Sequence, residues 1–249
     1  MKKIAVLTAL LFAALQIGYA QKVGLVLSGG GAKGAAHIGV IKALEENGIP
    51  IDYITGTSAG AIVGSLYAMG YTPEEMVELM LSEEFSYWQT GTVENEYKYY
   101  FKRPDPTPEF GHFSIDMTDS LQVKASFLPQ SLINPIQMNQ AFMALFSQAT
   151  AKAGWNFDNL FVPFRCVASD IYSKKAIIFK NGDLGDAVRA SMTFPFFFQP
   201  IWKDSVPIFD GGIYDNFPVG PMKEAFHPDF IFGSGVAGGN NKPSSNPYN

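Results

Sequence analysis

The sequence predicts an α/β fold, a three-layer α/β/α domain with a central, mostly parallel sheet. Apolar runs without a helical period alternate with segments whose apolar residues recur at helical spacing, which is typical of buried strands joined by helices. Two of these runs end in short glycine motifs, at 29–34 and 56–60, each followed at once by helix-like sequence. That order predicts right-handed crossovers and a sheet covered on both faces.

The first half of the chain supplies two strands and three helices. The strands are expected at 22–27 and 51–55, and the helices at 35–47, at 59–69 and from Thr72 onward. Gly48 and Gly70 follow the first two helices, where glycine commonly ends a helix. The third helix begins with the pattern of a capping box, in which Thr72 is the cap, Pro73 takes the first position and Glu75 reaches back.

The second half is irregular at its start. From about Glu83 to Ser131 the chain is aromatic and carries a proline cluster, so we expect an insertion over the sheet rather than another strand–helix unit. Order then returns, with expected helices at 134–152 and 183–192 and strands at 164–169, 175–179, 207–209 and 230–236. The strands at 164–169 and 175–179 have the spacing of a hairpin, and the last strand is expected to be buried.

The first twenty residues predict a secretory signal peptide. Lys2 and Lys3 form a charged start, residues 4–17 are apolar, and small residues precede Gln21, where cleavage is expected. The alternative is an uncleaved anchor helix, which the short apolar stretch disfavours. The expected organisation is a signal peptide at 1–20, one domain at 21–237 and a linker-like tail at 238–249. The leader resembles a bacterial one, which implies a periplasmic, outer-membrane-associated or secreted protein.

Composition and charge limit the classes of partner that this protein is expected to bind. Hydrophobic residues make up 47% of the chain and charged residues 16%, so we expect a tightly packed domain. The formal net charge is −5, and −7 without Lys2 and Lys3, which argues against nucleic acid as a partner. Any lipid contact is therefore expected through apolar surface. The lone Cys166 is expected to be a buried structural thiol, and the isolated histidines favour neither a metal site nor a cofactor.

The second glycine motif describes a nucleophile elbow. In Gly56-Thr57-Ser58-Ala59-Gly60 the serine stands on a strand-to-helix turn, and the flanking glycines leave room for the tight backbone. The first motif lies at the end of the neighbouring strand. Its backbone N–H groups, those of Gly29, Gly30 and Gly31, are expected to form an oxyanion hole beside Ser58. Together the two motifs predict a serine acyl hydrolase.

Asp210 is the expected base. It ends an apolar run and precedes Gly211 and Gly212, which let the chain turn sharply. Because parallel strands share one carboxyl edge, the glycine loop, Ser58 and Asp210 are expected to converge there. None of the three histidines fits as a partner, which favours a direct Ser–Asp dyad over a histidine-based triad. Such an aspartate must be partly desolvated, because an unperturbed pKa of ~3.9 makes it a weak base.

A nucleotide site is the alternative interpretation of the first motif. Gly29, Gly31 and Gly34 match the spacing of the dinucleotide-binding fingerprint. That fingerprint also needs an acidic residue at the end of the second strand, whereas Asp52 lies at the start of that strand. A P-loop is excluded, because Gly34 is followed by alanine rather than by a Lys-Ser/Thr pair.

The ordered motifs resemble those of the patatin-like phospholipase family, in its bacterial, secreted form. They are the glycine run, residues 56–60, Asp210-Gly211-Gly212 and the blocks 167–170 and 189–200, so the resemblance spans nearly the whole mature chain. It implies a patatin-like α/β/α fold and metal-independent hydrolysis of lipid acyl esters by a Ser58–Asp210 dyad. The residues that it implies in support of the motifs are Lys33, Gly34, Gly56, Gly60, Gly211 and Gly212.

The end of the chain departs from that family's pattern. Family members usually continue past the last strand with helical sequence, whereas this chain ends in a tail rich in Gly, Asn, Pro and Ser. Bacterial relatives with a leader often carry an outer-membrane barrel after this point. The resemblance therefore implies a C-terminal outer-membrane region that is not present in these residues.

The aromatic segments near the motifs have two interpretations each. Four phenylalanines precede the Asp210 strand, and we expect core packing for most of them and an acyl pocket for one or two: Phe194, Phe196, Phe197 and Phe198. Residues 97–101 suit either an interfacial lid or an ordinary loop.

The polar residues beside the motifs are weighed in the same way. Lys33 either attracts a phosphate head group or is simply solvated. Asp170 is expected in a turn. Arg189 and Ser191 are expected to pack and hydrogen-bond near the site rather than to take part in the chemistry.

The expected function is hydrolysis of fatty-acyl esters of lipids or phospholipids, with transient contact to a membrane surface. An acyltransferase shares the same acyl-enzyme and differs in the acceptor. The main competing interpretation is a non-catalytic passenger or binding domain of a larger outer-membrane protein, and a nucleotide-binding module is the third. The unbroken set of motifs favours the enzyme.

Overall fold

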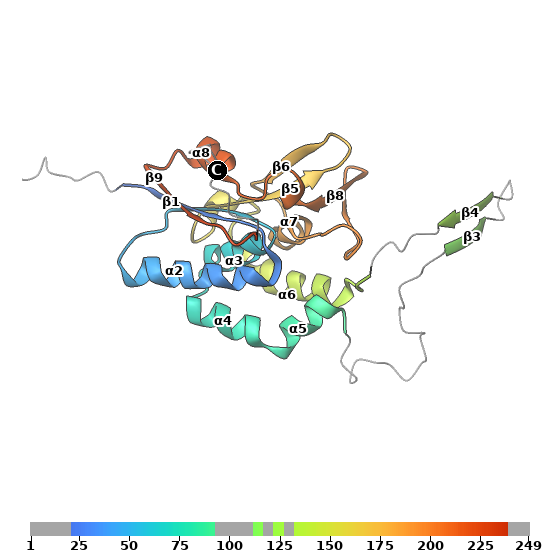
Figure 1. Cartoon of the computed structure of the whole chain (residues 1–249), viewed down its shortest axis with the longest axis horizontal. Helices are drawn as coiled ribbons and strands as arrows, with labels where there is room; N and C mark the ends of the chain where they lie inside the picture. Colours follow the sequence, from blue (N-terminus) through green and yellow to red (C-terminus); the bar gives the residue numbers. More distant parts are fainter. Residues whose placement is uncertain (1–20, 93–111, 117–121, 127–131, 239–249) are drawn as a thin grey trace, which may run out of the picture.

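A seven-stranded sheet lies at the centre of the computed structural model, which describes residues 21–92, 112–116, 122–126 and 132–238 (Figure 1). The strand order is β7-β8-β5-β2-β1-β9, with β6 paired to β5. The strands of this sheet are β1 (Val23–Leu27), β2 (Tyr53–Thr57), β5 (Phe164–Asp170), β6 (Lys175–Phe179), β7 (Ile201–Lys203), β8 (Val206–Asp210) and β9 (Phe230–Ser234). A separate antiparallel pair joins β3 (His112–Asp116) to β4 (Gln122–Ser126).

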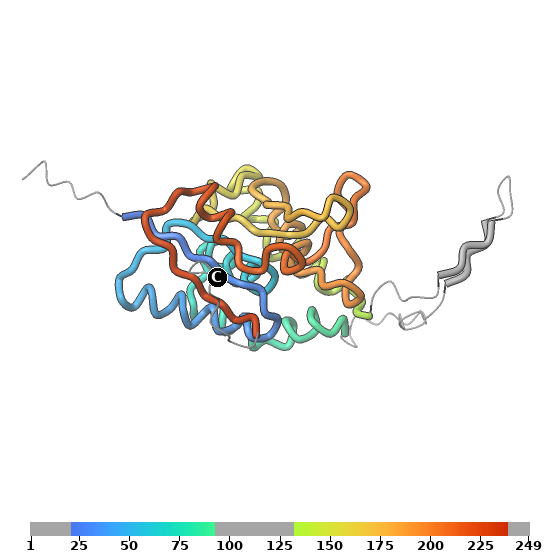
Figure 2. The backbone as a smooth tube through the Cα atoms, turned by 45° about the horizontal axis from the view of Figure 1, so that its top comes forward, coloured from blue at the N-terminus to red at the C-terminus, as the bar shows by residue number. Residues whose placement is uncertain are grey.

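The sheet is mixed and mostly parallel, as predicted. Strands β9, β1, β2 and β5 run parallel, and Figure 2 shows the first and last strands of the domain, β1 and β9, side by side. The expected hairpin is confirmed, because β6 pairs antiparallel with β5. The expectation that the Asp210 strand shares the parallel direction is wrong, because β8 pairs antiparallel with β5 and β7.

Helices cover both faces of the sheet. They are α2 (Ala36–Glu46), α3 (Ala59–Ala68), α4 (Pro73–Leu81), α5 (Glu83–Thr90), α6 (Ile136–Lys152), α7 (Leu184–Ser191) and α8 (Val219–Phe226). Figure 1 shows α8 above the sheet and α2 and α3 below it, with α4 and α5 forming a further layer. Among the described residues, no helix combines the length and apolarity needed to cross a bilayer.

The two faces of β1 and β2 explain why these layers form. Ile54 and Leu27 point to α3, where Gly64 lets the helix approach them closely. On the other face, the ring of Tyr53 stacks on Phe226 of α8, with 4.6 Å between the ring centroids. Parallel strands buried on both faces need apolar residues at successive positions, and β1 is buried throughout.

The helix start predicted at Thr72 is confirmed by its capping hydrogen bonds. The Thr72 hydroxyl accepts a hydrogen bond from the Glu75 N–H, and the Glu75 carboxylate accepts one from the Thr72 N–H, which completes the capping box. The helices expected at 134–152 and 183–192 are confirmed as α6 and α7.

Four elements of the main domain differ from the sequence prediction. The insertion does not begin at Glu83, because Ser82 caps α5 and Gly91, with φ 70°, ends it. Strand β7 and helix α8 were not predicted. The last strand, β9, is an edge strand rather than a buried one, and Phe230 and Phe232 on it are exposed. Within the rest of the predicted insertion the structure describes the pair β3 and β4, which was not predicted. Residues 97–101, the leader at 1–20 and the tail from 239 onward lie outside the described residues.

Candidate functional site

Strand register brings Ser58 and Asp210 to the same level of the sheet. In the parallel pair of β2 and β5, Thr57 lies opposite Val167, so Ser58 follows at the level of Ala168. In the antiparallel pair of β5 and β8, Asp210 lies opposite Ala168 itself. Strand β8 starts beyond the carboxyl end of β5 and runs back toward it. The predicted convergence is therefore present, although β8 reaches the edge from the opposite direction.

Ser58 occupies a strained turn between β2 and α3. Its φ is 54°, in the left-handed region that non-glycine residues rarely adopt. Its N–H donates to the Ser191 hydroxyl at 2.9 Å, and that hydroxyl donates to the carbonyl of Val167 at 2.6 Å. This confirms a hydrogen-bonding role for Ser191 and fixes the elbow to β5 through α7.

The glycines beside Ser58 are required by the backbone. A Cβ atom on Gly56 would meet the carbonyl of Gly60, and one on Gly60 would meet the carbonyl oxygens of Leu27 and Ser28. The first clash would force the turn open, and the second would push α3 away from the end of β1. Both glycines therefore keep the elbow against the glycine loop.

Asp210 is buried at the end of β8. Its Oδ1 accepts a hydrogen bond from the Gly212 N–H at 2.7 Å, in the turn that Gly211 and Gly212 form. Burial raises the pKa of the carboxyl above its ordinary value, and hydrogen bonds from the Ser58 side chain and the Gly212 backbone partly oppose that rise. The side chain is thus desolvated, as predicted, and directed at the serine.

The glycine loop lies against the same serine. A Cβ atom on Gly29 would lie 3.1 Å from the Cβ of Ser58. The N–H of Gly29 donates to the carbonyl of Asn216 at 3.1 Å, so it is not available to an oxyanion in this conformation. The N–H groups of Gly30 and Gly31 have no acceptor among the described residues. Of the three N–H groups predicted for an oxyanion hole, those of Gly30 and Gly31 are therefore the ones without a partner in the described part of the chain.

A cavity of about 960 Å³ opens beside these residues, at the upper end of the ~300–1,000 Å³ typical of small-molecule sites. Ser58, Asp210 and residues 29–31 contribute to its wall. Most of the remaining wall is apolar and comes from four helices and the segment after α7: Ile62, Met80, Phe85, Trp88, Met138, Phe142, Met192, Phe194, Phe197 and Phe198. An aliphatic chain fits such a lining, because it brings no polar groups to be satisfied.

The phenylalanine segment differs from the expectation of core packing. Phe198 is buried, whereas Phe194, Phe196 and Phe197 are exposed. Phe194, Phe197 and Phe198 line the cavity, which is more than the expected one or two. A turn at residues 195–197 lies within the segment, which belongs to no helix or strand.

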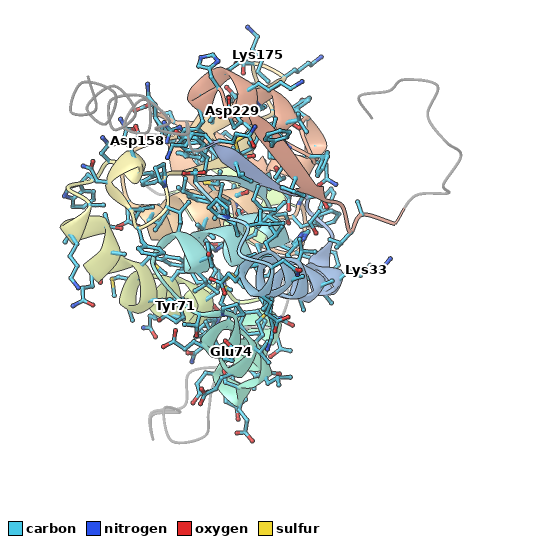
Figure 3. All side chains as sticks on the ribbon, turned by 90° about the vertical axis from the view of Figure 1, so that its left-hand side faces the viewer. Lys33, Tyr71, Glu74, Asp158, Lys175 and Asp229 are labelled. Carbon is cyan, nitrogen blue, oxygen red and sulfur yellow. The ribbon has the colours of Figure 1, made fainter. Side chains whose placement is uncertain are left out.

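The remaining predicted residues take supporting or unrelated positions. Lys33 points away from the domain into solvent (Figure 3) and is absent from the cavity wall, which favours the solvated interpretation. Cys166 is buried, and burial raises the pKa of its thiol, as expected for a structural residue. The Asp170 carboxylate accepts from the N–H groups of Tyr172 and Ser173, which confirms its turn role. The described residues contain no cluster of potential metal ligands.

Two further residues support the site and were missed by sequence reasoning. Asn216 contacts the glycine loop, because its carbonyl accepts from Gly29 and its side-chain amide lies 3.4 Å from the Gly29 carbonyl oxygen. His37 is fully buried, with Nε2 2.9 Å from the carbonyl oxygen of Ser28 and Nδ1 2.7 Å from the Ser234 hydroxyl. The sequence signal for Asn216 is its position shortly after the Asp210 turn, whereas nothing in the sequence pairs His37 with Ser234.

Comparison with known proteins identifies the family of this domain. Residues 25–223 match the family model described as patatin-like phospholipase. The chain belongs to the patatin-like phospholipase family. Its domain is that of a lipid acyl hydrolase, which confirms the predicted class of enzyme.

The relatives are much longer proteins. The chain is 32% identical over 213 residues to lysophospholipase NTE1 of Pyricularia oryzae, which covers 85% of this chain and 12% of the relative. It is 29% identical over 203 residues to the patatin-like phospholipase domain-containing protein ZK370.4 of Caenorhabditis elegans, covering 81% and 12%. Among solved structures, VipD of Legionella pneumophila aligns with a TM-score of 0.49 and 16% identity, over 80% of this chain and 47% of VipD.

Proposed function

We propose that this domain hydrolyses acyl esters of phospholipids, with Ser58 as the nucleophile and Asp210 as its base. One observation carries the proposal: a serine held in a strained turn lies beside a buried carboxylate in the wall of a large apolar cavity. Strained residues that face a cavity cluster at active sites, and a desolvated carboxylate is a stronger base than an exposed one.

The first half of the reaction forms an acyl-enzyme. The Ser58 Oγ bonds to the ester carbonyl carbon while its proton passes to Asp210. The carbonyl oxygen becomes an oxyanion, which the N–H groups of Gly30 and Gly31 stabilise. The bond from the carbon to the alcohol oxygen then breaks, and that oxygen takes the proton from Asp210.

The second half returns the enzyme to its starting state. A water molecule gives a proton to Asp210 as its oxygen bonds to the acyl carbon. The bond to Ser58 breaks, the serine oxygen regains the proton, and the fatty acid leaves. Gly212 holds one oxygen of Asp210, so the carboxylate keeps a fixed orientation through both halves.

The cavity supports a lipid substrate with its acyl chain among the apolar side chains. The Pyricularia relative is named a lysophospholipase, so the substrates for testing are phosphatidylcholine and lysophosphatidylcholine, with fatty-acid release as the measurement. The signal peptide and an export location stay predictions from the leader sequence, as does the outer-membrane region beyond this chain.

The decisive test is intact-mass analysis of the purified chain after treatment with a lipid-like fluorophosphonate. We expect one adduct on the wild type, none on Ser58→Ala and slow labelling of Asp210→Asn. Two matched variants are expected to label normally. Ser65→Ala removes another hydroxyl of α3, which is bonded to Ile62, and Asp215→Asn alters a second half-buried carboxyl of the same loop.

The outcome separates the competing interpretations. A wild type that gives the far-UV circular dichroism of a folded domain and takes no adduct would contradict the proposal and favour the non-catalytic binding domain. Labelling that persists in Ser58→Ala would place the nucleophile elsewhere.

A further inference from the structure

Six exposed apolar side chains line the cavity or stand within two residues of a residue that does, and we call them the mouth patch: Leu132, Ile136, Phe194, Phe196, Phe197 and Ile213. Phe194, Phe197 and Ile213 also line the cavity, so the patch and the cavity wall are continuous. The N–H groups of Leu132 and Ile133 donate to the carbonyls of Phe196 and Phe197, both at 2.9 Å. These bonds join the start of α6 and the phenylalanine segment into one surface.

Both the exposure and the backbone conformation of Phe196 are energetically unfavourable. Its side chain is 63% exposed, and its φ of 69° lies in the left-handed region that asparagine or glycine adopts at much lower cost. It does not line the cavity, so neither the acyl pocket nor the core accounts for it. A bulky apolar residue held outward under backbone strain indicates a function at the surface.

A buried arginine keeps the segment in this shape. The guanidinium of Arg189 donates to the Thr193 hydroxyl at 2.6 Å and to the Gln199 carbonyl at 3.2 Å, at the two ends of the segment. It also lies 5.1 Å from the centre of the Phe198 ring. The aromatic rings are therefore presented by a fixed loop, which lowers the entropy lost when they dock.

The two chain segments that carry five of the six residues of the mouth patch contain no charged residue. Residues 132–151 contain no Asp, Glu, Lys, Arg or His, and neither do residues 190–202. The exposed side of α6 thus has no charged residue until Lys152, and the nearby Arg189 and Asp210 are both buried. These segments have no cation to attract an anionic partner. They also have no charged group to be desolvated when they contact a surface of zero net charge.

We propose that the mouth patch docks on the surface of a zwitterionic phospholipid assembly, with Phe196 and Ile136 inserted among the lipids. This rests on the proposed function, because it places the mouth of the acyl cavity against its substrate. The driving force is burial of apolar surface, so binding does not depend on anionic lipids or on low salt.

The test measures vesicle binding separately from catalysis. Vesicles of dialkyl-ether phosphatidylcholine contain no acyl ester, so sedimentation with them reports binding alone. We expect the double variant Phe196→Asn/Ile136→Gln to bind about ten-fold or more weakly than the wild type, since transfer of such side chains from water is worth that much or more. Asparagine suits the left-handed backbone at 196, so the fold is retained.

The matched control changes an exposed aromatic and an exposed aliphatic residue elsewhere. Tyr172→Asn/Ile178→Gln alters the β5–β6 hairpin, whose turn ends near Lys175 at the top of Figure 3. We expect this variant to bind vesicles like the wild type. The fraction of wild-type protein that sediments with the vesicles should be the same in about 0.1 M and about 1 M salt.

Fluorophosphonate labelling in solution distinguishes the two proposals. Normal labelling of Phe196→Asn/Ile136→Gln with unchanged vesicle binding overturns the docking surface and leaves the proposed function intact. If the wild type takes no label but its vesicle binding depends on the mouth patch, the proposed function is overturned and the docking surface stands. Salt-sensitive binding, or loss of a dimer in the patch variant without loss of vesicle binding, also overturns the docking surface.

Discussion

At Ser58 the chain accepts a backbone conformation that costs about 1–3 kcal/mol for a residue other than glycine. The cost is offset by contacts that a loop serine would lack. Its N–H is bonded to Ser191, and its carbonyl accepts the first N–H groups of α3 from Ala61 and Ile62. The nucleophile proposed here is thus held by its own backbone, which leaves the hydroxyl to the cavity.

The neighbouring Asp210 gives a prediction for pH. Burial raises its carboxyl pKa above 3.8, and the proposed mechanism needs the ionised form. The rate of fluorophosphonate labelling should therefore fall as the pH decreases toward that raised pKa, with a midpoint above 3.8. The measurement is the labelling rate between about pH 4 and pH 8. A rate that is constant down to pH 4 contradicts the role of Asp210 as base.

At the scale of elements, the contact of α3 with the end of β1 depends on a single glycine. A Cβ at position 60 would meet the backbone of Leu27 and Ser28, whereas one at Gly39, exposed on α2, meets nothing within 4 Å. We expect Gly60→Ala to lower the free energy of unfolding by about 1–3 kcal/mol and to slow labelling. Gly39→Ala should raise that free energy by about 0.5–1 kcal/mol.

Urea unfolding and labelling of both variants check this pair. Equal stability of Gly60→Ala and the wild type would show that the helix shifts at no cost. The site would then tolerate movement between the elbow and the glycine loop.

The elements that the sequence predicts are those with local signals. The strand–glycine–helix units around 29–34 and 56–60, and the capping box at Thr72, are specified by neighbouring residues. The direction of β8 is not, because it depends on pairing with β5 some forty residues earlier. Helix α5 was missed because its aromatic residues made it look like part of the irregular insertion that follows. Its ends are nevertheless marked by Ser82 and Gly91.

The candidate site follows the same rule. Ser58 and Asp210 stand in motifs that can be recognised one at a time. The occupied N–H of Gly29 depends on Asn216, a residue 187 positions away. The outward direction of Phe194 and Phe196 depends on Arg189, which contacts both ends of their segment.

At the scale of the whole molecule, His37 links α2 to the carboxyl ends of β1 and β9 through Ser28 and Ser234. Burial lowers its pKa below 6.5, so the folded protein favours the neutral ring. Below pH 6.5 the unfolded chain binds more protons at this position than the folded one. The free energy of unfolding should therefore decrease as the pH falls from 6.5 through the lowered pKa.

Unfolding by urea at about pH 7.5 and about pH 5.5 measures this contribution. The comparison is with His37→Gln, because buried carboxyls such as Asp210 act with the opposite sign and do so equally in both proteins. The wild type should lose more stability between the two pH values than the variant. Equal losses would contradict the role of His37.

The late position of β8 in the chain also determines when Ser58 and Asp210 can come together during synthesis. Ser58 emerges from the ribosome early, within its own strand–helix unit. Asp210 follows 152 residues later, and its place beside Ser58 depends on the pairing of β8 with β5 and of β5 with β2. A nascent chain therefore carries Ser58 without its proposed base until nearly the whole domain is made, so the proposed activity can begin only late in synthesis.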